Sequence, residues 1–204
     1  IRSPHLIELI TGDEILDIVK NYLGCNPTLF DLNLICSFGS EEKYHETHHF
    51  HRDHDDFHHV LLMIYLSDVA ENSGGHIYAQ KSHSLHNLSS QMIPKIKENN
   101  SVQDRISDMD LFKHEIICGE AGTGFITDAN GLHSGSVPQP NKRRFAFWAR
   151  YGLGPNYMWE VHNHRYWGYE PKIFKKKIQA INLDKNFIFR YFLQDYNKIF
   201  FKNK

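Results

Sequence analysis

The chain lacks any long hydrophobic run, and its charge has no marked excess of either sign. The longest uninterrupted apolar stretch covers residues 60–66, which is far too short to cross a bilayer as a helix. The 204 residues include 23 basic and 24 acidic side chains, which gives a formal net charge of -1. We therefore expect neither a nucleic-acid nor a membrane partner.

Cysteine is scarce and forms no recognisable pattern. The three cysteines, Cys25, Cys36 and Cys118, are odd in number, widely spaced and in no C-x-x-C arrangement. This usage predicts free thiols in a reducing compartment rather than a disulfide framework. The first residues also show no charged-then-apolar leader, so we expect a cytoplasmic protein.

Internal repeats and low-complexity linkers are missing as well. The length suits one domain, and a hydrophobic fraction of 41% is enough to bury a real core. We expect a single domain over residues 1–204, with a core at about 28–152 and a C-terminal tail at about 155–204. The tail carries apolar residues at helical spacing, so we expect it to be helical.

The apolar periodicity predicts mostly short strands with a helix near each end. Residues 12–23 have helical spacing, Thr11 and Glu14 have the form of a capping box, and Gly24 is a good helix stop. Strand patterns occupy 28–37, 59–69, part of 71–84, 123–127 and 143–152, whereas 84–112 resembles loop and short helix, and 128–142 resembles loop. The pattern indicates a mainly β protein with flanking helices, either a sandwich or a barrel.

Histidine is the residue in excess. The chain has 15 histidines, and a dense group of them lies between His45 and His59. Such a group suggests metal chemistry, but one ion cannot use all of it. We expect most of the group to be solvated or to lie beside the ligands, namely His45, His48, His49, His54, His58 and His59.

Two ways of choosing ligands from this group are weak. An H-x-H pair at 49–51 would begin a cupin-type site, but the glutamate such a site needs is absent until Glu71, beyond the following strand. An H-D doublet at 54–55 would suit an all-helical phosphohydrolase, but the adjoining "VLLMIYL" favours a strand.

The third choice pairs His51 with Asp53. On a strand, residues i and i+2 point to the same face, so H-x-D delivers an imidazole and a carboxylate to one place. A second histidine would complete the facial triad that binds Fe(II) and leaves an open face for other ligands. His133 in "DANGLHSG" is the candidate, because it precedes a strand that opens with Arg143 and Arg144. Arginine at this distance suits the distal carboxylate of a 2-oxoglutarate co-substrate.

Three segments carry a resemblance to a known family: "SPHLIELITGDEILDIVKNYLGCNPTLFDLNLICSF", "FHRDHDDFHHVLLMIYLSDVAENSGGHIYAQKSH" and "GTGFITDANGLHSGSVPQPNKRRFAFWARYG". Over roughly residues 3–152 the chain resembles the phytanoyl-CoA dioxygenase-like group of Fe(II)/2-oxoglutarate oxygenases. The resemblance implies a double-stranded β-helix in which His51, Asp53 and His133 hold iron. Two departures stand out: the family's G-S-H turn reads Lys81-Ser82-His83, and the last fifty or so residues match no pattern of the family.

The resemblance also implies how 2-oxoglutarate is bound. The family register selects Arg144 for the distal carboxylate, while the more apolar companions of Arg143 on the same strand favour Arg143. Further candidates for contacts with 2-oxoglutarate or with the arginine are Tyr65, Asn33, Ser134 and Ser136.

The implied function is that of an Fe(II)- and 2-oxoglutarate-dependent dioxygenase. Such an enzyme would use dioxygen to hydroxylate a small organic substrate while 2-oxoglutarate is decarboxylated to succinate and CO2. Asp53 favours hydroxylation over halogenation, because halogenases of this type lack the carboxylate ligand. The alternative is a non-catalytic or zinc-type metal-binding β-barrel protein. The sequence indicates neither the substrate nor the oligomeric state.

Overall fold

The computed structural model describes residues 4–39, 48, 50–53, 55–84 and 112–153. The expectations for 85–111 and for the C-terminal tail lie outside these residues. In chain order the elements are α1 (Pro4–Ile10), α2 (Asp13–Leu23), β1 (Thr28–Phe38), β2 (His59–Tyr65), the 3-10 helix η2 (Glu71–Ser73), β3 (His76–Ala79), β4 (His114–Ile117), β5 (Gly124–Asp128), β6 (His133–Gly135) and β7 (Arg143–Gly152).

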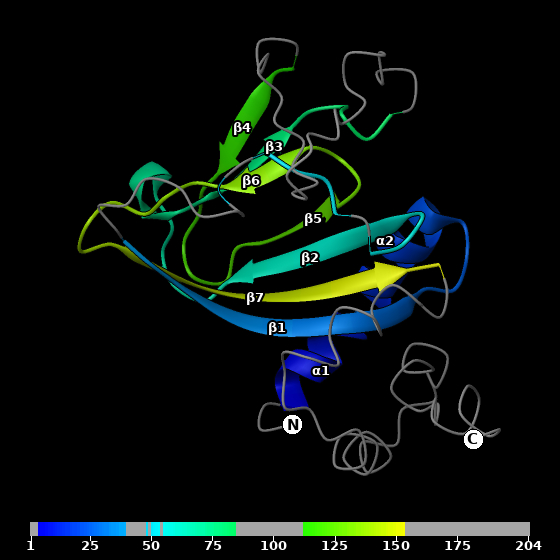
Figure 1. The fold of residues 1–204 in the computed structure, drawn as a ribbon. Coiled ribbons are helices and arrows are strands. Elements are labelled where there is room, and N and C mark those ends of the chain that lie inside the picture. The colour runs from blue at the N-terminus through cyan, green and yellow to red at the C-terminus, as the bar shows by residue number, and fades with distance from the viewer. Residues whose placement is uncertain (1–3, 40–47, 49, 54, 85–111, 154–204) are drawn as a thin grey trace, which may run out of the picture. The chain divides into compact units, whose positions relative to one another are not determined.

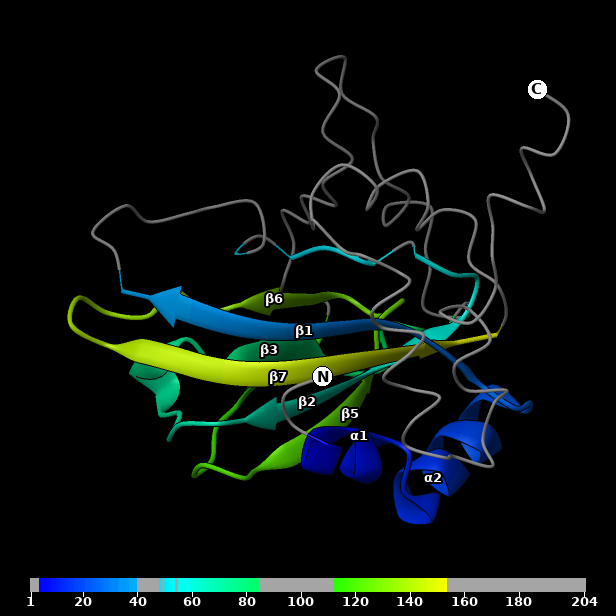
Figure 2. The ribbon, with the colours of Figure 1, turned by 90° about the horizontal axis from the view of Figure 1, so that it is seen from below.

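The described strands form two sheets (Figures 1 and 2). One has the order β1-β7-β2-β5 and the other β4-β3-β6. Within them β2 runs antiparallel to β5, and β3 runs antiparallel to both β4 and β6. The last strand of the described chain, β7, lies between the first two. The mainly β prediction is therefore confirmed, with neighbours that come from distant parts of the sequence.

The described residues fall into two compact units. One comprises those within Ile1–Asp31, Asp55–Phe57 and Arg150–Lys204, and the other those within Leu32–His54 and His58–Ala149. Strands β1 and β7 each contribute residues to both units. A single domain over the whole chain stays a prediction.

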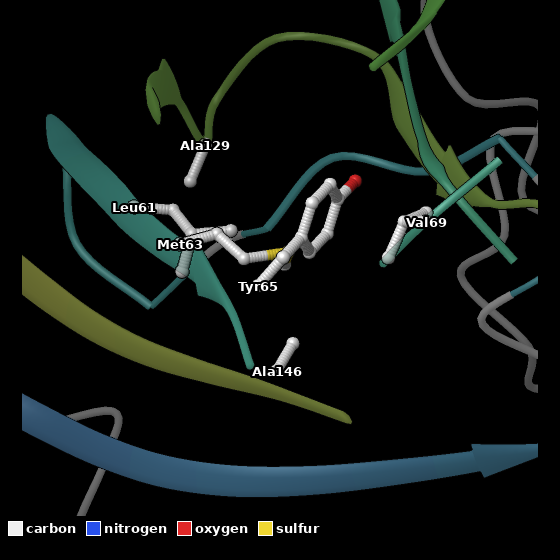
Figure 3. Packing of buried hydrophobic residues seen from close by; sticks show 6 residues of the cluster. All are labelled: Leu61, Met63, Tyr65, Val69, Ala129 and Ala146. Atoms are coloured by element: carbon white, nitrogen blue, oxygen red, sulfur yellow. The ribbon is translucent and has the colours of Figure 1, made fainter. Parts of the chain in front are cut away.

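A hydrophobic cluster lies in the second unit (Figure 3). Along β2 every second side chain points to it, as the alternation of a strand requires, and every residue of β2 is buried. Figure 3 shows these side chains beside those from β7 and from the loops, and Phe125 and Trp148 pack against the cluster. The six buried members are Leu61, Met63, Tyr65, Val69, Ala129 and Ala146.

The helix predicted for 12–23 is confirmed, with a start one residue later. It buries Leu16, Val19 and Leu23 and ends at Gly24, whose φ of 72° is the left-handed conformation that glycine adopts readily. None of the described helices is long and apolar enough to cross a membrane.

The predicted capping box is wrong. Gly12 is the N-cap residue of α2, and no side chain caps this end. The Thr11 hydroxyl instead donates to the Ile7 carbonyl at 2.7 Å. The cause is the helix α1, which no sequence pattern predicted. Because α1 ends at Ile10, Thr11 belongs to the turn that closes α1.

The loop expected for 128–142 contains a short strand. Residues His133–Gly135 form β6 and pair with β3, with Tyr78 opposite His133 and His76 opposite Gly135. A three-residue strand has too few positions to show alternation, so the pairing with β3 defines it. This pairing fixes the place of His133.

Candidate metal centre

The structure brings His51, Asp53 and His133 together. One potential ligand atom from each lies within 4.8 Å of the others. His51 Nε2 is 3.6 Å from Asp53 Oδ1, and His133 Nε2 is 3.7 Å from Asp53 Oδ2. The two imidazole rings have their centroids 4.5 Å apart. Two nitrogens and a carboxylate thus converge on one small volume.

Backbone hydrogen bonds hold this arrangement. The His51 N–H donates to the His133 carbonyl at 2.9 Å, and the His133 N–H donates to the His51 carbonyl at the same distance. The Asp53 N–H donates to the Ala129 carbonyl at 3.0 Å. The segment that carries the H-x-D pair is therefore an isolated bridge to β6 rather than part of a longer strand, but it keeps the i, i+2 geometry.

A further hydrogen bond sets the tautomer of His133. Its Nδ1 lies 2.8 Å from the Gly131 carbonyl oxygen. A carbonyl oxygen can only accept, so Nδ1 carries a proton; in the neutral imidazole that binds metals, the lone pair is then on Nε2, the atom that faces Asp53. A histidine ligand of a metal is commonly oriented in this way.

The chemistry of the donor set suits a divalent transition metal. Two neutral imidazoles and one carboxylate form the facial triad of non-heme Fe(II) sites, and similar groups also bind zinc. The Asp53 side chain is 13% exposed and that of His133 is 7% exposed. These residues could therefore hold an ion that is largely screened from solvent.

The two neighbouring arginines of β7 lie in different environments. Arg144 is buried, with 8% of its surface exposed, whereas Arg143 is exposed and its guanidinium lies 5.6 Å from the Phe145 ring centroid. Arg144 Nη1 donates to the Gly74 carbonyl, and Nη2 donates to the Ser37 hydroxyl at 3.2 Å. Burial lowers the pKa of Arg144 from its usual value. No sequence pattern indicated Ser37 as a partner of this arginine.

Tyr65 connects the two sheets of the described chain. Its hydroxyl donates to the Ile117 carbonyl at 2.7 Å and accepts the His76 N–H at 3.1 Å. Burial raises the pKa of this tyrosine. Asn33 of β1 is partly buried, and Ser134 and Ser136 are buried and half-buried. Their contacts with a co-substrate stay predictions.

His76 is a residue near the site that no sequence pattern indicated. This β3 residue is buried, and its ring centroid lies 5.4 Å from that of His133 and 5.6 Å from that of Phe125. Burial, followed by the nearby charges of His133 and Arg144, holds its pKa well below the usual value. His76 shares a strand face with Tyr78, but only the structure shows that Tyr78 lies opposite His133, so no local pattern in the sequence indicated it.

The remaining histidines of the cluster differ from one another. His58 Nε2 lies 3.1 Å from Asp128 Oδ2, and His48 is partly buried. His59 is fully buried and is therefore not solvated. It opens β2, a strand that is buried along its whole length, and one of its ring nitrogens lies within 4.8 Å of an Asp53 carboxylate oxygen. His45, His49 and His54 lie outside the described residues.

Comparisons with known proteins found similar solved structures. No family model and no curated protein matches the chain. It is similar to the non-heme alpha-ketoglutarate-dependent epimerase SnoN from nogalamycin biosynthesis, with a TM-score of 0.54 and 16% identity over 74% of this chain and 58% of that chain. It is also similar to EctD from S. alaskensis with bound Fe, with a TM-score of 0.55 and 14% identity over 77% of this chain and 59% of that one.

At these identities the likeness shows the fold, which is the double-stranded β-helix that the resemblance implied. The chain spans less than three fifths of the length of both proteins, at 58% and 59%. Membership of the phytanoyl-CoA dioxygenase-like family stays a prediction.

Proposed function

We propose that the protein is an Fe(II)- and 2-oxoglutarate-dependent oxygenase whose iron ligands are His51, Asp53 and His133. The observation that carries the proposal is the convergence of their ligand atoms within 4.8 Å. The hydrogen bond that directs the His133 Nε2 lone pair toward Asp53 supports it. So does the fold, since SnoN has been solved in complex with Fe3+ and alpha-ketoglutarate.

Bound iron would supply the oxidising chemistry, with 2-oxoglutarate decarboxylated to succinate and CO2 as dioxygen is consumed. The chain's own residues would bind and orient the reactants. Arg144 is the residue that we assign to the distal carboxylate of 2-oxoglutarate, because a buried planar guanidinium suits a carboxylate better than any other side chain. The Gly74 carbonyl and the Ser37 hydroxyl hold this guanidinium in place.

We further propose that the reaction is hydroxylation of a small organic substrate in the cytoplasm. Asp53 supports hydroxylation because it fills the position that a halide ligand would need. The cysteines are free, which is compatible with a reducing compartment. An alpha-ketoglutarate-dependent epimerase has a similar fold. Identification of the product is therefore needed to distinguish hydroxylation from epimerisation and other reactions.

The test is whether the Fe(II)-loaded protein binds 2-oxoglutarate without oxygen and forms succinate in air. Asp53→Ala should lower Fe(II) affinity by about a hundredfold or more, since even changes to partners outside the ligand set cost about 10–100-fold. Asp68→Ala is the matched control, because Asp68 is exposed and its carboxylate accepts the Ala121 N–H in a turn. Unchanged Fe(II) binding by Asp53→Ala would reject this set of ligands.

The second candidate is a zinc-type metal-binding protein without oxygenase activity. The donor set favours it as well, because imidazole and carboxylate are ordinary zinc ligands. The buried Arg144 distinguishes the two, since a site that only stores or senses a metal has no need of a buried cation nearby. Tight zinc binding together with no detectable 2-oxoglutarate binding would select this second function.

A further inference from the structure

His76, the first residue of β3, is a buried histidine. Its Nε2 has no hydrogen-bond partner among the described residues, although the side chain is almost completely buried. A buried polar group without a hydrogen-bond partner destabilises a protein relative to one whose hydrogen bond is made. A bound ligand that accepts a hydrogen bond from Nε2 would explain why a histidine is buried at this position.

Arg144 has the same property. Its Nε is also buried and has no partner within the described part of the chain, while Nη1 and Nη2 bind Gly74 and Ser37. Two buried nitrogen atoms, one on each residue, therefore lack acceptors. A carboxylate has two oxygens and could accept from both nitrogens at once.

The backbone neighbours of His76 connect it both to the candidate metal centre and to Arg144. Two residues after His76, Tyr78 is opposite His133. Two residues before it, Gly74 accepts the hydrogen bond from Arg144. The Tyr65 hydroxyl binds the His76 N–H and also interacts with Arg144. His76 thus lies beside the path that would connect iron to the arginine.

We propose that His76 is a co-substrate-binding residue whose Nε2–H donates a hydrogen bond to the distal carboxylate of 2-oxoglutarate, beside Arg144. This inference rests on the proposed function. It adds a second donor at the distal end, so the site would select dicarboxylic over monocarboxylic 2-oxo acids through two residues from different strands. His76 would not contact iron and would leave the three ligands unchanged.

The experiment compares 2-oxoglutarate with 2-oxobutyrate, which lacks the distal carboxylate. Both acids are titrated calorimetrically, without oxygen, into the Fe(II)-loaded full chain. His76→Leu should weaken 2-oxoglutarate binding by about tenfold or more and leave 2-oxobutyrate binding and Fe(II) affinity unchanged. His76→Gln keeps an N–H near the position of Nε2 and should recover most of the affinity. His114→Leu, which changes an exposed histidine of the neighbouring strand β4, should have no effect.

Thermal unfolding of the ligand-free protein supplies an independent readout. Because leucine removes a buried polar atom that lacks a partner, His76→Leu should be as stable as the parent protein or more stable. Destabilisation of this variant with equal loss of both acids would assign His76 to packing and overturn the inference. Unchanged 2-oxoglutarate binding by His76→Leu, with weakened binding by Arg144→Leu, would overturn it while the proposed function stands. Failure of the parent protein to bind 2-oxoglutarate would overturn both.

Discussion

Arg143 and Arg144 are adjacent residues that the strand β7 turns toward different surroundings. Arg144 is buried and Arg143 is exposed, so only the first could serve an enclosed carboxylate. Arg144→Ala should weaken 2-oxoglutarate binding about a hundredfold, because the charge-assisted hydrogen bond and the ion pair with the distal carboxylate are lost. Fe(II) affinity should stay close to that of the parent protein. Arg143→Ala is the matched control and should change neither quantity in calorimetric titrations.

The opposite result, in which Arg143→Ala weakens binding, would mean that the co-substrate approaches from the solvent-exposed face of β7. If neither change has an effect on an otherwise folded protein, 2-oxoglutarate has no arginine partner on this strand. The zinc-type candidate would then gain support.

At the residue scale, the sequence predicted the candidate metal ligands better than it predicted the residues around them. The spacing of His51 and Asp53 predicts that their side chains meet, because i and i+2 share a face in extended chain. The contacts of His76 and Ser37 depend on which strands pair, and β3 and β1 show no pattern that says so. Long-range pairing therefore limits what local spacing can predict about a site.

At the scale of elements, the turn after β3 contains a conformational strain that can be tested. Lys81 has a φ of 63°, which costs a residue with a side chain about 1–2 kcal/mol. It occupies the place of the glycine in the G-S-H turn of the family that the sequence resembles. Lys81→Gly should raise the free energy of unfolding by about 1 kcal/mol, after the larger entropy of the unfolded glycine chain is subtracted.

Asn141 provides the control for this change, because it has a φ of 67° and asparagine tolerates this region better than lysine does. Asn141→Gly should therefore gain less than Lys81→Gly when both are compared by urea unfolding. A loss of stability in Lys81→Gly would mean that the lysine side chain makes a compensating contact.

The long elements were predicted from their period, and the short strands β3 and β5 were predicted as well. The β2 and β7 patterns extend over many positions and were recognised. The short elements α1, β4 and β6 were not. The capping-box prediction at Thr11 failed for a related reason. A threonine at this position fits both the start of one helix and the end of another, and α1, which was not predicted, makes Thr11 part of a helix end.

At the scale of the molecule, buried tyrosines predict how stability changes at alkaline pH. Burial raises the pKa of Tyr65, Tyr78 and Tyr151 above the usual value near 10. An unfolded chain therefore releases these protons at lower pH than the folded chain does. Their contribution to stability is complete below about pH 10 and is lost as the pH rises toward the folded-state values.

The free energy of unfolding should therefore fall as the pH is raised from 9 to about 11. Tyr151→Phe removes one of the three groups and should make this decline shallower, although it also removes the hydrogen bond to the Ile10 carbonyl and lowers stability at neutral pH. Urea unfolding at several pH values measures both effects. An equal slope for the parent and the variant would show that Tyr151 does not contribute to it.

The division into two units is a property that the sequence did not indicate. Each of β1 and β7 reads as one uninterrupted strand, yet each has residues in both units. Hydrophobic alternation reports which face of a strand is buried, but it carries no information on which set of neighbours buries it.

The paired hydrogen bonds between the backbones of His51 and His133 have a consequence for how a metal would be taken up. The two histidines are far apart in the sequence, and joining them costs chain entropy. The bridge forms during folding, so this entropy is lost before a metal ion binds. The ligand atoms are therefore already in position when the ion binds. Such a site is preorganised: the ion could be removed and exchanged for another without unfolding the protein around it, and metal selectivity would depend on the geometry of the donors and on which ions the cell supplies.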